Sequence, residues 1–252
     1  MAKLYAGTSG FAYPSWKPRF YPSDVPAKRF LEYYSRRLNS VEINYTFRRL
    51  AASTTLENWI KATEPGFLFV TKAHERITHL LRLKDAAEFT DLFLRSIDPL
   101  RATRRLGPIL FQLPPYLRCD VSVLRDFLIR LPRDLRYTFE FRNASWLDDA
   151  VYDLLRQHNA ALCWAESEKI EIPEVATADF AYFRLRKEEY SPAERKKIAA
   201  AVKKVLTEGK DVFVFFKHEE TPEGALYAEE LLKAVASDKG RVERGGAPLS
   251  ES

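Results

Sequence analysis

Residues 137–166 decide the fold, and they read YTFEFRNASWLDDAVYDLLRQHNAALCWAE. The first part, 137–142, is rich in aromatic and β-favouring side chains, which is typical of a strand. An apolar series with helical spacing follows at 151–155, and a second short apolar strand follows at 160–166. A strand, a helix and another strand in this order predict a βαβ unit with parallel strands.

The same order of elements repeats along the chain. Eight short β-rich runs lie at 3–8, 40–46, 67–73, 107–113, 137–142, 160–166, 180–186 and 211–217. Helical patterns separate most of them, and Ser191 with Glu194 forms a capping box at the start of one. Residues 167–177 are the exception, because they show no helical period. Eight such units in 252 residues predict a single closed (β/α)8 TIM barrel. An open Rossmann-like sheet is the rival fold, but the chain has no glycine-rich nucleotide motif.

Composition limits the class of protein. The chain has 46% hydrophobic and 13% aromatic residues, which excludes a disordered protein. No apolar run fits a membrane span and the N-terminus lacks the apolar stretch of a signal peptide, so we expect a soluble cytoplasmic protein. One barrel domain is expected over residues 1–236, with a polar, glycine-rich, disordered tail over 237–252. Cys119 and Cys163 stand among apolar neighbours and are expected to be buried free thiols.

The charge balance is mildly basic. Forty Lys and Arg against 35 Asp and Glu leave a formal net charge of +5. This favours anionic partners, without deciding between phosphates, carboxylates and nucleic acid.

Charged and polar side chains interrupt the apolar strands near their C-terminal ends, where TIM barrels place their active sites. Strand alternation and proximity to the strand ends lead us to expect these at the barrel mouth: Glu42, Asn44, Lys72, Gln112, Glu140, Arg142 and Arg184. In our hypothesis the two arginines bind an anionic group of a small substrate. Glu42, Lys72 and Glu140 are then the candidate catalytic residues, with Lys72 a held cation, a base or an imine-forming amine. The alternative is a lattice of buried ion pairs that serves stability alone.

Further residues are expected to contact the substrate from the loops and the last strand. They are Tyr13, Trp16, His79, Trp146, Lys217 and His218. The three aromatic residues also fit a different function class, a nuclease or lesion binder, because aromatic rings stack on exposed bases. A non-enzymatic scaffold is a third reading. We expect no cofactor and no metal, because no metal-ligand spacing such as H-E-x-x-H or C-x-x-C occurs.

Several motifs along the chain resemble one known family. They are Gly7-Thr8-Ser9-Gly10-Phe11, Val41-Glu42-Ile43-Asn44, Leu110-Phe111-Gln112-Leu113-Pro114-Pro115, Glu140-Phe141-Arg142, and Tyr182 with Arg184. This pattern resembles the YecE-like family, known as domain of unknown function 72. The resemblance implies a TIM barrel and leaves the reaction open. Where many members have His-Gly after strand seven this chain has Arg186 and Lys187, so we expect a more basic mouth.

Overall fold

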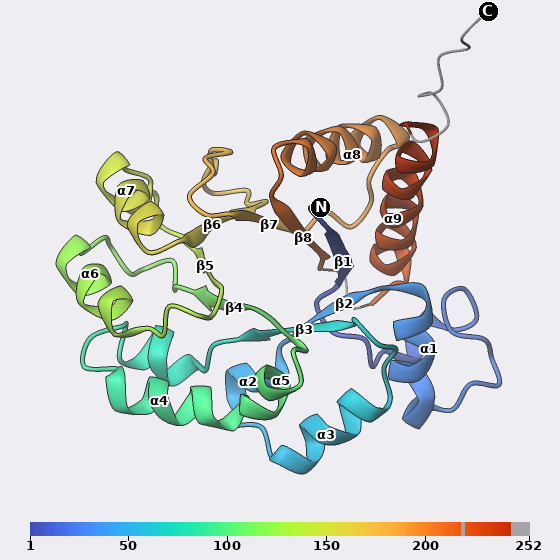
Figure 1. Ribbon diagram of the computed structural model, residues 1–252, viewed down its shortest axis with the longest axis horizontal. Coiled ribbons are helices and arrows are strands. Elements are labelled where there is room, and N and C mark those ends of the chain that lie inside the picture. Colours follow the sequence, from blue (N-terminus) through green and yellow to red (C-terminus); the bar gives the residue numbers. More distant parts are fainter. Residues whose placement is uncertain (218–219, 243–252) are drawn as a thin grey trace, which may run out of the picture.

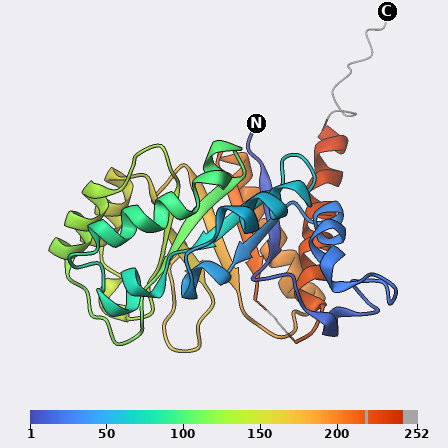
Figure 2. The ribbon, with the colours of Figure 1, turned by 90° about the horizontal axis from the view of Figure 1, so that it is seen from below.

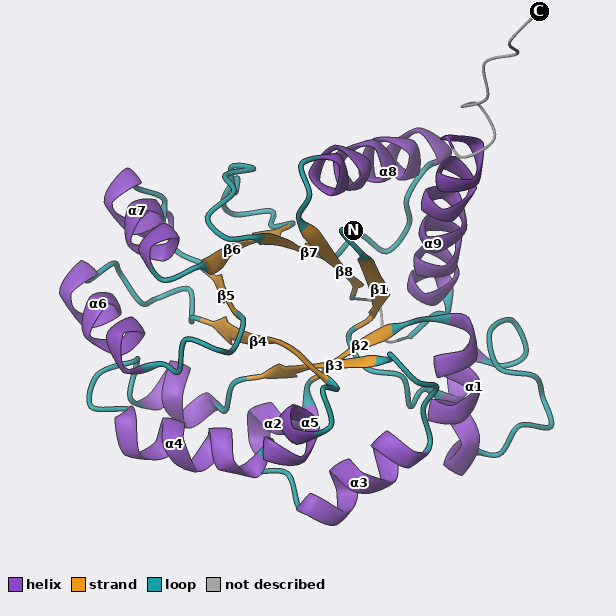
Figure 3. Ribbon diagram, in the orientation of Figure 1, coloured by secondary structure: helices purple, strands orange, loops and turns teal. Residues whose placement is uncertain are grey.

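The computed structural model describes residues 1–217 and 220–242. In this part of the chain, eight parallel strands form one sheet that curls into a nearly closed barrel, with helices around its outside (Figures 1 and 3). The strands are β1 (Leu4–Thr8), β2 (Ser40–Ile43), β3 (Leu68–Lys72), β4 (Leu106–Gln112), β5 (Tyr137–Glu140), β6 (Ala160–Ala165), β7 (Phe180–Leu185) and β8 (Asp211–Phe216). The first and last strands pair, from Leu4 with Val212 to Thr8 with Phe216, and lie side by side in Figure 2. The predicted TIM-barrel fold is confirmed.

Helices cover most of the outer face. They are α1 (Phe30–Arg37), α2 (Tyr45–Arg48), α3 (Ser53–Lys61), α4 (Ala87–Ser96), α5 (Asp98–Ala102), α6 (Val121–Arg130), α7 (Asp149–Gln157), α8 (Pro192–Thr207) and α9 (Glu223–Val242). Helix α8 begins with the predicted capping box of Ser191 and Glu194. No described helix combines the length and the apolar character needed to cross a membrane.

Helix α9 is longer than the sequence suggested. It continues through Val242, so residues 237–242 extend a helix where we expected the tail to begin. No proline occurs between Pro222 and Pro248, and a helix continues at little cost per residue until a breaker stops it. Residues 243–252 lie outside the described part of the chain.

The junction between β1 and β2 is closed mainly by side chains. The described backbone there has one isolated bridge, between Ser9 and Glu42. The Asn39 amide bonds to the backbone of β1, and the Tyr34 hydroxyl links the backbones of both strands. A Cβ on Gly7 would lie 1.9 Å from a β2 carbonyl oxygen, so this close approach requires glycine. The barrel therefore closes by side-chain hydrogen bonds where its backbone ladder is interrupted.

The barrel interior has two layers. The lower layer is apolar and includes the buried side chains of Val70, Ala161, Cys163, Phe180, Tyr182, Phe213 and Phe215. Charged side chains occupy the layer above it, toward the C-terminal strand ends. Tyr182 belongs to both layers, because its ring lies 5.3 Å from that of Phe215 while its hydroxyl bonds to Glu42. Cys163 is buried as expected, whereas Cys119 is only half-buried, because it lies in a loop after β4.

The connection from β6 to β7 contains no helix. Residues 166–179 return to the start of β7 as an irregular loop (Figure 1), in agreement with the missing helical period in the sequence. The Thr177 hydroxyl anchors this loop by donating to the Ala160 carbonyl and accepting from the Leu162 amide, both at 2.7 Å. An extended chain is narrower than a helix about 10 Å across, so the outer face of β6 and β7 has a thinner cover.

Candidate functional site

Glu42 lies at the centre of the charged layer and is fully buried. Its Oε1 accepts hydrogen bonds from Ser9 Oγ at 2.6 Å and from Arg184, and its Oε2 accepts from the Tyr182 hydroxyl at 2.7 Å and Arg184 Nε at 2.9 Å. Each oxygen therefore accepts two hydrogen bonds, which is its full capacity. Burial by itself would raise the pKa of Glu42, but Arg184 outweighs it and the net direction is down. The carboxylate is ionised at neutral pH.

Glu140 repeats this arrangement from β5. Its neighbour Gln112, opposite it on β4, donates to both carboxylate oxygens at 2.9 Å. Arg184 donates to one of these oxygens and Arg186 to the other. Burial opposes ionisation, but the two arginines outweigh it and lower the pKa of Glu140 to about 2. All four acceptor positions of this carboxylate are occupied as well.

Arg184 joins the two carboxylates. It comes from β7, its side chain is 1% exposed, and it forms ion pairs with both Glu42 and Glu140. The pKa of Arg184 is raised well above its usual value, since the two carboxylates outweigh the effect of burial. We call Glu42, Arg184 and Glu140 the ionic lattice. Neither carboxylate accepts a proton without losing one of its four hydrogen bonds.

Lys72 lies in the same layer and is 9% exposed, but it is not bonded to the lattice. Its Nζ lies 3.9 Å from the centre of the Phe47 ring, as in a cation–π contact. Within the described residues, Lys72 Nζ forms no hydrogen bond and no ion pair, and the atom itself is not completely buried. Burial and the charge of Arg184 lower the pKa of Lys72 to about 8, although Glu42 and Glu140 act in the opposite direction. Lys72 is therefore a buried amine whose proton is weakly held.

Two predicted mouth residues do not bond to the lattice. Arg142 was expected to face inward with the lattice, but β5 ends at Glu140, and Arg142 is exposed in the following loop. Alternation holds only within a strand, and Arg186 bonds to Glu140 instead. Asn44 follows the end of β2 and is half-buried at the start of α2; its side chain makes no hydrogen bond with the described residues.

The aromatic residues expected to contact a substrate are mostly part of the core, which corrects that expectation. Trp16 is fully buried in a cluster of aromatic rings. Trp146 is 1% exposed, donates to the Leu117 carbonyl at 2.8 Å and stacks on Phe141. Neither tryptophan ring is accessible to a stacking base, because both apolar rings are packed among the side chains of the core. Tyr13 is half-buried and donates to the Ser9 carbonyl. In the alternative function, a nuclease or lesion binder, neither tryptophan can stack on a base. That function remains a prediction.

His79 and Lys217 do lie near Lys72. The imidazole of His79 meets the Phe47 ring edge to face at 5.1 Å, and Lys72 lies over the same ring. Burial, followed by the charge of Lys72, lowers the pKa of His79. Lys217 follows β8 and its charge also lowers the pKa of Lys72. His218 lies outside the described residues.

Three residues that contact Glu42, Glu140 or Lys72 in the charged layer were not identified from the sequence. Tyr182 shares the inward parity of Arg184 within β7, so period-two alternation carried a signal for it, whereas Arg186 directly follows the strand and was expected only to make the mouth more basic. Phe47 follows a strand end within a short helix, and no pattern in the sequence places it over Lys72. Among the described residues, no group of three His, Cys, Asp or Glu side chains is arranged to hold a metal ion.

Comparison with known proteins gives the family. A family model described as protein of unknown function DUF72 matches residues 5–250. The UPF0759 protein YunF of Bacillus subtilis is 28% identical over 171 residues, which cover 65% of this chain and 59% of that protein. The match thus spans less than two thirds of YunF.

Solved structures agree. A DUF72 family protein from Thermotoga maritima superimposes with a TM-score of 0.82 at 27% identity, covering 93% of this chain and 99% of its own. A DUF72 family protein from Enterococcus faecalis superimposes with a TM-score of 0.77 at 20% identity, covering 92% of this chain and 96% of its own. The chain therefore belongs to the DUF72 family of proteins of unknown function.

Proposed function

We propose that the protein is an enzyme that binds a small anionic substrate at the barrel mouth and exchanges a proton with it through Lys72. The observation that carries this proposal is the contrast within one buried layer. The carboxylates of Glu42 and Glu140 have all their acceptor positions filled, whereas the buried Lys72 amine has no hydrogen-bond partner among the described residues. A charged side chain that is only 9% exposed and that no protein group binds is costly, which supports a role beyond packing.

The charges around Lys72 favour an anion. The charged layer around Lys72 contains the cations Lys72, Arg184 and Arg186, against the carboxylates Glu42 and Glu140. This surplus of positive charge attracts an anionic group electrostatically, and the lattice keeps Arg184 fixed while the anion binds. Carboxylates and phosphate esters are the substrate classes with suitable charge.

The acidity of Lys72 suits proton transfer. A general acid or base works best when its pKa lies near the operating pH, and that of Lys72 is about 8. A bound anion would raise this pKa, because it stabilises the ammonium form. In this proposal Glu42 and Glu140 orient Arg184 and tune the electrostatics, and Lys72 alone moves the proton.

The experiment uses a panel of small carboxylates and phosphate esters in D2O, with deuterium incorporation and product formation followed by NMR. Wild-type protein is expected to act on at least one member, and Lys72→Met to lose about 10²–10⁴-fold in rate. The matched control is Lys61→Met on the exposed face of α3, which should retain full activity. Activity that survives Lys72→Met would refute the proposal. Inorganic phosphate should raise the pKa of Lys72 in an NMR titration. An unchanged pKa would contradict the proposal that the substrate is an anion.

A further inference from the structure

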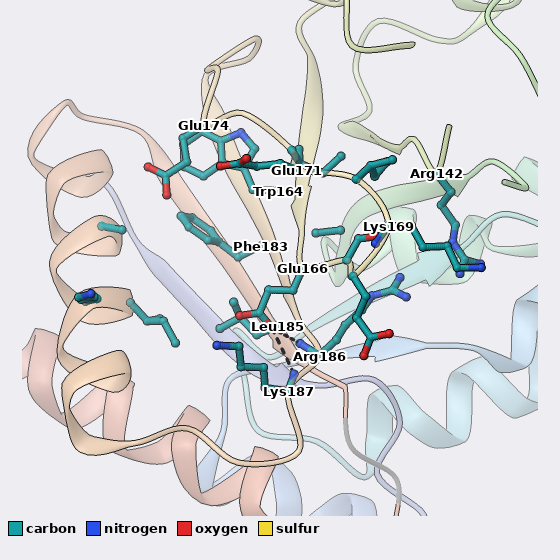
Figure 4. A pocket seen from close by; sticks show the side chains of 18 residues that line it. Arg142, Trp164, Glu166, Lys169, Glu171, Glu174, Phe183, Leu185, Arg186 and Lys187 are labelled. Carbon is teal, nitrogen blue, oxygen red and sulfur yellow. Dashed lines mark hydrogen bonds between the residues drawn. The ribbon is translucent and has the colours of Figure 1, made fainter. Parts of the chain in front are cut away.

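A hollow of about 710 Å³ lies on the outer face of β6 and β7, beside the barrel mouth (Figure 4). Its volume falls in the range of small-molecule sites, roughly 300–1,000 Å³. The hollow exists because residues 166–179 return as a loop, which leaves part of the sheet without a covering helix.

The floor of the hollow is apolar. Trp164 and Phe183 are register partners on the two strands, and their rings meet edge to face at 4.8 Å. Leu185 lies two residues further along β7, about 7 Å nearer the mouth. Ile198 and Ala201 of α8 form the facing wall. Such a floor suits an aromatic or branched aliphatic group.

The two ends of the hollow differ in charge. Figure 4 shows Glu171 and Glu174 near Trp164, and Arg186 and Lys187 near Leu185 at the mouth end. The contact of Trp164 Nε1 with the carbonyl oxygen of Val175, at 3.2 Å, keeps the acidic part of the loop at the far end.

Two cations on the mouth side are available to a ligand. Arg142 and Lys169 line the hollow, are exposed, and form no ion pair with any described residue. The acids near them are Glu166 and Glu168. Glu166 is already bonded to the backbone amides of residues 186 and 187 and to the Tyr190 hydroxyl, whereas Glu168 is exposed to solvent. In addition, the buried Nε of Arg186 has no hydrogen-bond partner in the described structure.

We propose that this hollow is a binding site for a small amphiphilic anion. The apolar body packs on Trp164, Phe183 and Leu185, and the carboxylate, sulfonate or phosphate group is held by Arg142 and Lys169. Glu171 and Glu174 disfavour a second anionic group at the far end. The site is distinct from Lys72, which lies inside the barrel, and the proposal holds whether or not Lys72 is catalytic.

The first test uses 1-anilinonaphthalene-8-sulfonate, a fluorescent aromatic sulfonate, as the probe. Ala201→Phe fills the hollow from α8 without removing a core side chain, and we expect it to weaken dye binding at least tenfold. Ala200→Phe, on the exposed side of the same helix, is the matched control and should change the affinity less than twofold. Lys169→Gln should weaken binding about threefold, the size expected for one exposed charge pair. Equal dye binding by the two phenylalanine variants would overturn the proposal.

The second test fixes the ligand class by displacement of the dye. The anion 4-phenylbutyrate should compete, whereas the matched cation 4-phenylbutylamine and the dianion suberate should compete at least tenfold more weakly. Displacement by the amine at equal concentration would overturn the assignment of an anionic head group. If the protein forms a dimer and Ala201→Phe dissociates it, a second copy of the chain occupies the hollow. If the dye binds only after residues 243–252 are removed, that segment occupies the hollow. Either result would overturn the small-ligand proposal.

Discussion

Arg184 and Lys72 are buried cations in the same layer of the barrel, and their surroundings are opposite. Arg184 forms ion pairs with Glu42 and Glu140, which raise its pKa, whereas Lys72 contacts an aromatic ring and has a lowered pKa. A paired buried charge holds the structure together, while an unpaired one costs stability. Burial of a charged residue in a barrel mouth therefore does not indicate its role. The groups that bind the charge indicate it.

The largest expected effect is on the ionic lattice. Arg184→Met leaves two buried carboxylates unpaired, and we expect a loss of about 3–5 kcal/mol in the free energy of unfolding at pH 7, measured by chemical denaturation. Arg156→Met is the control, because its ion pair with Asp153 is exposed, and it should cost less than about 1 kcal/mol. If both substitutions cost the same, the lattice does not stabilise the barrel.

Acid should weaken the lattice in a predictable window. The pKa of Glu140 is about 2 in the folded protein, below the usual 4.5, so the folded state binds fewer protons than the unfolded chain as the pH falls. The stabilisation is therefore complete above about pH 5 and is lost progressively toward pH 2, by up to about 3 kcal/mol. Denaturation of wild type and Glu140→Gln across this range measures the difference. Parallel pH profiles of the two proteins would contradict the lowered pKa.

Replacing Lys72 should change stability in the opposite direction to replacing Arg184, and by the smallest amount, although folding lowers the pKa of Lys72 as it does that of Glu140. The pKa of Lys72 falls from 10.5 to about 8 on folding, so between these values the folded protein has lost a proton that the unfolded chain keeps, and stability rises with pH. Lys72→Met should lack this rise and be more stable than wild type at pH 7 by about 1–3 kcal/mol. Lys61→Met controls for the loss of a lysine charge. A destabilised Lys72→Met would place Lys72 with Arg184 as a structural cation.

Much of this site followed from the sequence. The inward positions of Glu42, Lys72, Gln112, Glu140 and Arg184 were predicted from strand alternation and from their place near the strand ends, and the structure brings all five together. Alternation is a property of the extended backbone and needs no knowledge of the neighbouring strands. Arg142 does not join the lattice, because β5 ends at Glu140 and alternation says nothing about the residue at which a strand ends.

The sequence by itself determined the order of strands and helices, the barrel and the inward set of charges, since these depend on local periodicity and on chain connectivity. Tertiary structure alone decided that the carboxylates bond to Arg184 and that Lys72 has no hydrogen-bond partner among the described residues, because that depends on the register between strands distant in the chain. It also buried Trp16 and Trp146 and left the hollow over Trp164 open. Whether an aromatic residue is covered depends on which segment packs over it, and no local pattern encodes that contact.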